Sequence, residues 1–124
     1  MKVKSTIILG LFTALSFSAP STAADAALGE KVFRKCKACH SMDAGKRMIG
    51  PSLAGVFGRT AGDIEGYKYS KGMLAYGQVW DDETMTAYLK APRKVVKGTK
   101  MAFAGLRKPA DIENLIAYLK ANGG

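Results

Sequence analysis

Apolar residues recur with helical spacing near the start of the chain, from Ala26 to about Cys39. The positions i, i+3, i+4 and i+7 of one helical face are Gly29, Val32, Phe33 and Cys36. Asp25 can cap this helix, because a carboxylate there accepts hydrogen bonds from the first unpaired backbone N–H groups. Gly29 either lets another backbone approach closely or merely weakens the helix, and the pattern favours neither interpretation.

A second helix is predicted to begin after a cap at Asp81 or Asp82 and to run to Ala91. Its inward face consists of Met85, Tyr88 and Leu89. Pro92 stops this helix, because proline lacks the N–H group that would continue the helical hydrogen bonds.

The last helix is predicted to open at Pro109 and to end at Asn122-Gly123. Its apolar stripe consists of Ile112, Leu115, Ile116 and Leu119. The chain shows no internal repeat, no low-complexity tract and no sustained alternation of apolar and polar residues. The predicted fold class is therefore all-α.

Long irregular segments separate these helices. Residues 45–62 are punctuated by glycine, residues 66–80 carry three tyrosines and the only tryptophan, and residues 91–108 contain six basic residues and no acid. Loops of this length normally count against a compact domain, unless they pack on something large. The chain is therefore expected to wrap around a sizeable bound group.

Both cysteines and the only histidine lie in one pentapeptide, Cys36-Lys37-Ala38-Cys39-His40. In a C-x-x-C-H sequence the two thiols can add across the vinyl groups of one haem, and the adjacent imidazole can reach the iron. A redox disulfide is expected in a βαβ pattern, which the chain lacks, and a zinc site needs about four ligands. We therefore interpret the motif as the attachment site of one covalent haem c with its iron, with chance occurrence as the remaining alternative.

The first 23 residues have the organisation of a secretory signal peptide. Lys2 and Lys4 form a positive start, residues 7–17 an apolar core, and residues 20–24 a small-residue end, with cleavage expected after Ala23 or Ala24. An uncleaved membrane anchor is the alternative, but this apolar run is shorter than the ~20 residues that span a membrane. Cleavage leaves one domain, residues 24–124, and lowers the formal charge from +9 to +7. In a bacterium, such a signal peptide would place the protein in the periplasm.

A haem iron that carries electrons needs a second axial ligand besides His40, and the chain has no second histidine. Methionine is the natural candidate, and the residues available after Met1 are Met42, Met48, Met73, Met85 and Met101. Met101 is favoured, because it lies 61 residues beyond His40 in a segment between two helices and can approach from the opposite side of the ring. Met73 also lies in an irregular segment and stays open as an alternative.

Other residues can serve the same haem. A carbonyl at Gly50-Pro51 can orient the imidazole of His40 through a hydrogen bond. The candidate donors to the haem propionates, which would otherwise be buried without partners, are Arg59, Tyr69 and Trp80.

From Gly29 to Lys120 the chain resembles the class I c-type cytochromes, close to the bacterial cytochrome c2 and mitochondrial cytochrome c group. The segments that carry this resemblance are Cys36-x-x-Cys39-His40, Gly50-Pro51-x-Leu53, Gly55-x-Phe57-Gly58-Arg59, Trp80, Tyr88-Leu89, Gly98-Thr99-Lys100-Met101-x-Phe103-x-Gly105 and Leu115-Ile116-x-Tyr118-Leu119. They occur in the family's order and at nearly its spacings. Two departures stand out: Lys97 occupies a place where relatives often have proline, and Met73 one where they often have a polar residue near a propionate.

The resemblance implies a small single-haem fold in which the N- and C-terminal helices cross and long coils wrap the haem. In that fold, Gly29 and Phe33 would pack against Leu115 and Tyr118. It also implies thioether bonds at Cys36 and Cys39 and axial ligation by His40 and Met101. The further implied contacts are Pro51 with His40, Tyr88 and Thr99 near Met101, and Arg59, Tyr69 and Trp80 with the propionates.

Together these features predict a soluble periplasmic one-electron carrier rather than an enzyme, monomeric and without nucleic-acid partners or a membrane span. The resemblance points to a bc-type quinol-oxidising complex as electron donor and to a terminal oxidase, peroxidase or photosynthetic reaction centre as acceptor, so the role is in respiration or photosynthesis. A basic ring around the haem edge is expected to meet acidic docking surfaces on these complexes. The ring residues are Lys35, Lys37, Lys46, Arg47, Arg93, Lys94, Lys97 and Lys100.

Two other classes of function compete with this prediction. A haem peroxidase or gas sensor would need Met101 to be displaceable, which Lys97 in place of proline would make easier. A thiol–disulfide oxidoreductase would leave both cysteines free and the protein colourless.

Overall fold

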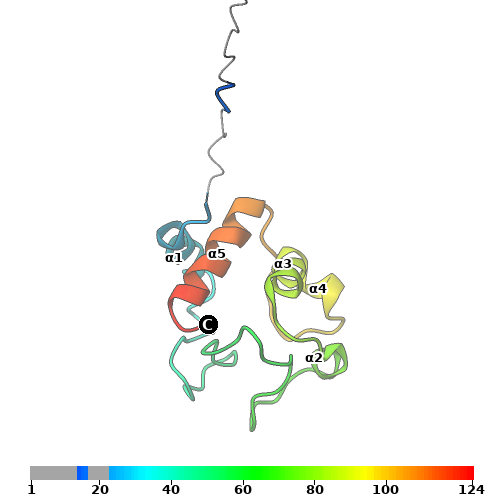
Figure 1. The fold of residues 1–124 in the computed structure, drawn as a ribbon. Helices are drawn as coiled ribbons and strands as arrows, with labels where there is room; N and C mark the ends of the chain where they lie inside the picture. Colours follow the sequence, from blue (N-terminus) through cyan, green and yellow to red (C-terminus); the bar gives the residue numbers. More distant parts are fainter. Residues whose placement is uncertain (1–13, 17–22) are drawn as a thin grey trace, which may run out of the picture.

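The structure is a computed structural model that describes residues 14–16 and 23–124, so the predicted signal peptide lies almost entirely outside it. The helices in chain order are α1 (Ala26–Phe33), α2 (Lys71–Tyr76), α3 (Asp82–Lys90), α4 (Pro92–Val95) and α5 (Pro109–Ala121). Figure 1 shows α1 beside α5, α3 on the other side of α5, α4 beside α3, and the long segment between α1 and α2 below. The described residues form no strand beyond a single antiparallel bridge between Thr60 and Val79, which confirms the all-α prediction.

The first and last helices cross in close contact. A methyl group placed on Gly29 would overlap the backbone carbonyl of Asn114 and lie 2.7 Å from the Cβ of Tyr118. The rings of Phe33 and Tyr118 pack with their centroids 5.0 Å apart. The backbone N–H of Asp25 donates to the Asn114 side chain at 2.7 Å, which ties the start of α1 to α5. The glycine therefore permits close approach, and the predicted crossing of the terminal helices is confirmed.

Helix α1 begins as expected but ends early. The Asp25 carboxylate accepts from the N–H groups of Ala27 and Leu28, at 2.8 and 3.2 Å. The α-helix ends at Phe33, whereas the sequence pattern extended it to about Cys39. Beyond Phe33 the chain continues in turns, some closed by the tighter i to i+3 spacing, as in the 2.8 Å bond from Cys36 N–H to the Phe33 carbonyl.

Helix α3 starts and ends as expected. Asp81, and not Asp82, is its cap: the Asp81 carboxylate accepts from Thr84 N–H at 2.8 Å, and the Thr84 hydroxyl accepts from Asp81 N–H at 2.9 Å. This reciprocal pair satisfies two N–H groups that no helical carbonyl can reach. The buried residues of α3 and α5 are the predicted ones, namely Met85, Tyr88 and Leu89, and Ile112, Leu115, Ile116 and Leu119.

Two short helices lie in segments that the sequence pattern left irregular. Helix α2 is capped by Ser70, whose hydroxyl accepts from Met73 N–H at 3.0 Å, and it ends at Gly77 in the left-handed conformation. Helix α4 starts at Pro92, which therefore both stops α3 and opens the next helix, because proline is well suited to the first helical position. Helices of six and four residues are too short to show an apolar period, so the pattern could not reveal them.

The buried core joins the inner faces of α1, α3 and α5 to side chains from the loops. Its best-buried aliphatic members are Leu115 and Val96, each 1% exposed. No helix in the described ranges has the length and apolar character needed to cross a membrane.

Candidate functional site

The turns that follow α1 bring both thiols and the imidazole together. The N–H groups of Cys39 and His40 both donate to the Cys36 carbonyl, at 3.0 and 2.9 Å. Cys36 and Cys39 are both half-buried. Burial raises the pKa of the Cys36 thiol, and the nearby charge of Lys35 opposes this effect. One helical turn therefore presents two thiols and an adjacent imidazole, as attachment of a single porphyrin requires.

The imidazole of His40 is fixed by a backbone carbonyl. Its Nδ1 lies 2.8 Å from the Pro51 oxygen. Burial lowers the pKa of His40, while the contact with Pro51 acts in the opposite direction. A neutral imidazole that donates from Nδ1 keeps the lone pair on Nε2 for a metal.

Gly50 shapes the same pocket in a way that the sequence analysis missed. A methyl group on Gly50 would lie 2.5 Å from Cε1 and 2.8 Å from Nδ1 of His40. The Gly50 N–H also donates to the Cys39 carbonyl at 2.7 Å. The backbone at position 50 thus forms one wall of the imidazole site. The Gly-Pro pair by itself indicated a turn whose carbonyl could orient the imidazole, but not this close contact of Gly50 with the ring.

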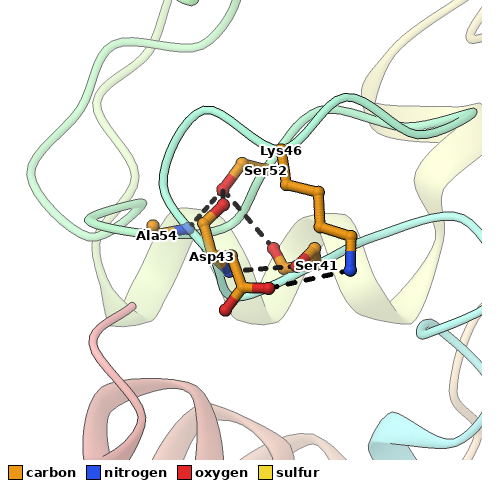
Figure 2. A network of polar contacts seen from close by, with 5 residues as sticks. All are labelled: Ser41, Asp43, Lys46, Ser52 and Ala54. Carbon is orange, nitrogen blue, oxygen red and sulfur yellow. Dashed lines mark hydrogen bonds and ion pairs between the residues drawn. The ribbon is translucent and has the colours of Figure 1, made fainter.

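A polar network that the sequence analysis also missed holds together the two segments that form the contact between His40 and Pro51 (Figure 2). The buried Ser52 hydroxyl donates to the Asp43 carbonyl at 2.7 Å, and the Ser41 hydroxyl accepts from the Asp43 N–H at 3.0 Å. Ser41 directly follows His40, and Ser52 directly follows Pro51. The network therefore fixes the segment after the imidazole to the segment that carries the carbonyl. The residues drawn are Ser41, Asp43, Lys46, Ser52 and Ala54.

The half-buried Met101 lies among polar side chains from two elements. The Thr99 hydroxyl accepts from the Met101 N–H at 3.2 Å, and the Tyr88 hydroxyl lies 3.9 Å from the Met101 sulfur. Tyr88 comes from α3 and is 7% exposed. Burial raises the pKa of the Tyr88 phenol, and the Thr99 hydroxyl works against this rise. Tyr88 thus lies near the thioether of Met101, and Thr99 bonds its backbone.

The other methionines have different surroundings. Met85 is 5% exposed and belongs to the core on α3. Met73 belongs to α2 and not to a coil, and with Met42 it packs against the core cluster.

Arg59 has one polar atom that the protein leaves without a hydrogen bond. Its two terminal nitrogens donate to the carbonyls of Ala54 and Ser52, at 3.0 and 3.2 Å. Its buried Nε has no hydrogen-bond partner and lies 3.6 Å from the carboxylate of Asp63. Arg59 also lines a hollow of about 330 Å³ with Pro51 and others. Beside its ion pair with Asp63, this Nε still lacks a hydrogen bond, so it can donate to an acidic group such as a haem propionate.

The other two proposed propionate contacts lie in aromatic surroundings. Tyr69 accepts the Ile64 N–H at 3.3 Å, which leaves its own O–H free to donate, and burial raises its pKa. Trp80 is 7% exposed and lies between Tyr76 and Tyr88, with ring centroids 5.6 and 5.0 Å away.

All eight residues of the expected basic ring are exposed. Two of them have contacts of their own: Lys46 lies 3.7 Å from the Asp43 carboxylate, and Lys100 donates to the Lys68 carbonyl at 2.9 Å. The remaining members are Lys35, Lys37, Arg47, Arg93, Lys94 and Lys97.

An all-α fold with crossed terminal helices, a C-x-x-C-H turn and loops gathered around it defines the class of c-type cytochromes. The family model described as Cytochrome c matches residues 26–122, so the chain belongs to the cytochrome c family. It is an electron-transfer protein whose cofactor is haem c with its iron. The two cysteines available for the covalent attachment are Cys36 and Cys39.

Within this family the chain is similar to bacterial cytochromes c2. It is 54% identical over 89 residues to cytochrome c2 iso-2 of Magnetospirillum fulvum, a match that covers 72% of this chain and 93% of the relative. It is 43% identical over 115 residues to cytochrome c2 of Blastochloris viridis, covering 92% of this chain and 91% of the relative. Among solved structures, cytochrome cH from Methylobacterium extorquens aligns with a TM-score of 0.73 at 43% identity, covering 79% of this chain and 99% of that one.

Proposed function

We propose that the protein is a one-electron carrier whose haem is bound through Cys36 and Cys39 and ligated by His40 and Met101. The observation that carries the proposal is that hydrogen bonds already hold both proposed axial ligands in place. His40 is fixed by the Pro51 carbonyl at 2.8 Å, and the Met101 segment is held by the hydroxyl of Thr99 at 3.2 Å. When bound, the haem iron changes between its ferric and ferrous states and so accepts or releases one electron.

The chain's own residues would keep the structural rearrangement that accompanies electron transfer small. The Pro51 carbonyl holds the proton on Nδ1 of His40, which fixes the ring orientation. The Tyr88 hydroxyl, 3.9 Å from the Met101 sulfur, restrains the thioether from its protein side. The buried side chains of Trp80 and Tyr88 would exclude water from the haem site. Arg59, Tyr69 and Trp80 would meet the propionates, and the buried Nε of Arg59, which has no hydrogen-bond partner, supports this.

The exposed basic residues support docking to acidic surfaces on larger redox complexes. The donor would be a bc-type quinol-oxidising complex, and the acceptor a terminal oxidase, a peroxidase or a photosynthetic reaction centre. The signal peptide at residues 1–23 would export the chain, so transfer would take place in the periplasm, with residues 24–124 as the mature domain. The relatives named cytochrome c2 are consistent with this assignment.

The ligation is tested by visible spectra of the oxidised and reduced holoprotein and of two variants. Met101→Ala is expected to abolish the weak far-red sulfur-to-iron band, whereas the control Met48→Ala retains it. A wild-type protein that is high-spin and binds carbon monoxide readily would contradict the carrier function and favour the peroxidase or gas-sensor alternative. A protein without haem would favour the thiol chemistry instead.

The docking surface is tested by electron transfer from a purified bc-type complex at increasing ionic strength. The double variant Arg93→Glu/Lys94→Glu is expected to slow the reaction and weaken its salt dependence, because two of the ring charges are reversed. The control Lys31→Glu changes an exposed lysine of α1 outside the ring. Equal rates of electron transfer for both variants would exclude the basic ring as the docking surface.

A further inference from the structure

Three oxidisable aromatic side chains, named the aromatic relay below, contact one another in the order Tyr88, Trp80 and Tyr76. The Tyr88 hydroxyl lies 3.9 Å from the Met101 sulfur. The ring centroids of Tyr88 and Trp80 are 5.0 Å apart, and those of Trp80 and Tyr76 are 5.6 Å apart. Both spacings are typical of aromatic rings in direct contact. The relay is therefore continuous from the proposed axial ligand to Tyr76.

The relay leads from the core to the surface. Tyr88 and Trp80 are each 7% exposed, whereas Tyr76 is half-buried. Tyr76 is the last residue of α2, and residues 77–79, which follow it in the connection to α3, are exposed (Figure 1). One end of the relay thus lies beside the proposed haem site and the other end is open to solvent.

Packing and haem binding do not account for the phenol of Tyr76. Tyrosine and tryptophan are the side chains without sulfur that lose one electron most readily, and a core can be filled equally well by phenylalanine. The polar groups of Tyr88 and Trp80 have proposed contacts with Met101 and the propionates. Tyr76 has no such contact in the proposed site, so the chemistry of its phenol calls for another explanation.

Tyr76 is also the member of the relay that can best release a proton. A tyrosine that loses one electron must give up its phenolic proton to form a neutral radical. Tyr88 is shielded from water by burial, whereas Tyr76 is partly open to it. Burial raises the pKa of Tyr76, and so does the exposed carboxylate of Asp81 nearby. The same negative charge stabilises positive charge on the ring as the electron leaves, so an oxidising equivalent comes to rest at Tyr76.

We propose that the aromatic relay carries strongly oxidising equivalents from the haem site to the surface at Tyr76, where they are discharged. The inference rests on the proposed haem ligation by His40 and Met101. It applies to strong oxidants such as hydrogen peroxide, because electron exchange with ordinary redox partners does not oxidise a phenol. The relay would protect the cofactor from oxidative destruction.

The electrons and protons of this discharge balance. Hydrogen peroxide accepts two electrons and two protons at the haem site, its O–O bond breaks, and two water molecules form. Each electron is replaced by one from Tyr76, whose O–H bond breaks as the proton passes to water. The resulting phenoxyl radical takes a hydrogen atom from a small reductant such as ascorbate, which restores the tyrosine. Two such turns consume one peroxide.

Trapping of the radical tests where the oxidising equivalent comes to rest. Ferric holoprotein is treated with hydrogen peroxide and a nitroso spin trap, and mass spectrometry of the digest locates the adduct, which we expect on Tyr76. Tyr76→Phe keeps the ring but removes the phenol, so this adduct should be lost and the haem should bleach several-fold faster. The matched control is Tyr118→Phe, which removes another half-buried phenol, one that packs on Phe33, and should leave both readouts unchanged. Equal bleaching of the two variants would overturn the relay.

Trp80→Phe tests whether the oxidising equivalent reaches Tyr76 through the relay. Phenylalanine keeps a ring in the core but resists oxidation, so the adduct on Tyr76 should fall several-fold per molecule of peroxide consumed. An unchanged yield would mean that peroxide attacks Tyr76 directly from solution, and it would overturn the relay.

The visible spectrum before peroxide is added separates the relay from the proposed ligation. A wild-type protein that shows the far-red sulfur-to-iron band but forms no adduct on Tyr76 would overturn the relay alone. Absence of the band would overturn the ligation by Met101, and with it the inference.

Discussion

Gly29 in α1 lies directly against the backbone carbonyl of Asn114 in α5, with no space between them for a methyl group. This contact sets the distance between the helix that leads into Cys36 and the helix that ends the chain. The geometry of the haem-binding turn is thereby coupled to the last element of the fold, because α1 cannot move outward without losing the packing of Phe33 on Tyr118.

Gly29→Ala tests this coupling. Overpacking at the crossing is expected to lower the free energy of unfolding by about 1–3 kcal/mol, although alanine would by itself favour the helix by about 1 kcal/mol. Urea unfolding of the holoprotein gives the difference. The exposed neighbour Glu30→Ala serves as control and should stay within about 0.5 kcal/mol of the wild type. A stabilised Gly29→Ala protein would show that the helices can separate at little cost.

Gly50→Ala should disturb the imidazole of His40 directly. The added methyl group would meet the ring 2.5 Å from Cε1, so either the ring or the backbone has to move. We expect a loss of about 1–3 kcal/mol in the free energy of unfolding, together with a changed far-red band in the ferric spectrum. Gly55→Ala is the matched control, because its φ of +64° brings backbone strain but no neighbour lies within 4 Å. A spectrum altered equally in both variants would contradict a specific effect on His40.

The cap of α3 should make stability depend on acid pH. Hydrogen bonds from Thr84 lower the pKa of Asp81 below its ordinary value of 3.8, so the folded state favours the carboxylate. The stabilisation is present above the unfolded pKa and is lost as the pH falls through the lower folded pKa. Asp81→Asn keeps an acceptor but removes the titration. The midpoint temperature of thermal unfolding should therefore fall less steeply for the variant than for the wild type between about pH 6 and about pH 2. Parallel curves for the two proteins would exclude a contribution of Asp81 to the pH dependence.

Arg59→Ala removes the side chain that bonds the carbonyls of Ser52 and Ala54. The free energy of unfolding should fall by about 1–3 kcal/mol, because buried acceptors lose a charged donor. The reduction potential should also fall, since loss of a nearby positive charge favours the ferric state. Potentiometric titration measures this shift, with the exposed Arg34→Ala as control for net charge. An unchanged potential would place the propionates away from Arg59.

Local sequence determined the parts of the site that lie close together along the chain. The C-x-x-C-H turn is one helical turn of five residues, so its chemistry is visible without a fold. Helices α3 and α5 follow from apolar spacing and caps, because each is long enough to show a stripe. The end of α1 and the short helices α2 and α4 were mispredicted, since fewer than two turns carry no period and tertiary packing decides their boundaries.

Only the tertiary structure decided which distant residues meet. Gly29 was ambiguous until the structure showed Asn114 against it. The Gly50-Pro51 turn was expected to orient His40 through a carbonyl, but only the structure showed Gly50 itself packed against the imidazole ring. The hydrogen bonds from Tyr67 to Ile49 and from Lys100 to Lys68 join residues 18 and 32 positions apart, which no helical or strand period encodes. Sequence thus determined the cofactor chemistry and the main helices, because these depend on neighbouring residues. The fold determined how the ligands are held, because that depends on backbones brought together from separate segments.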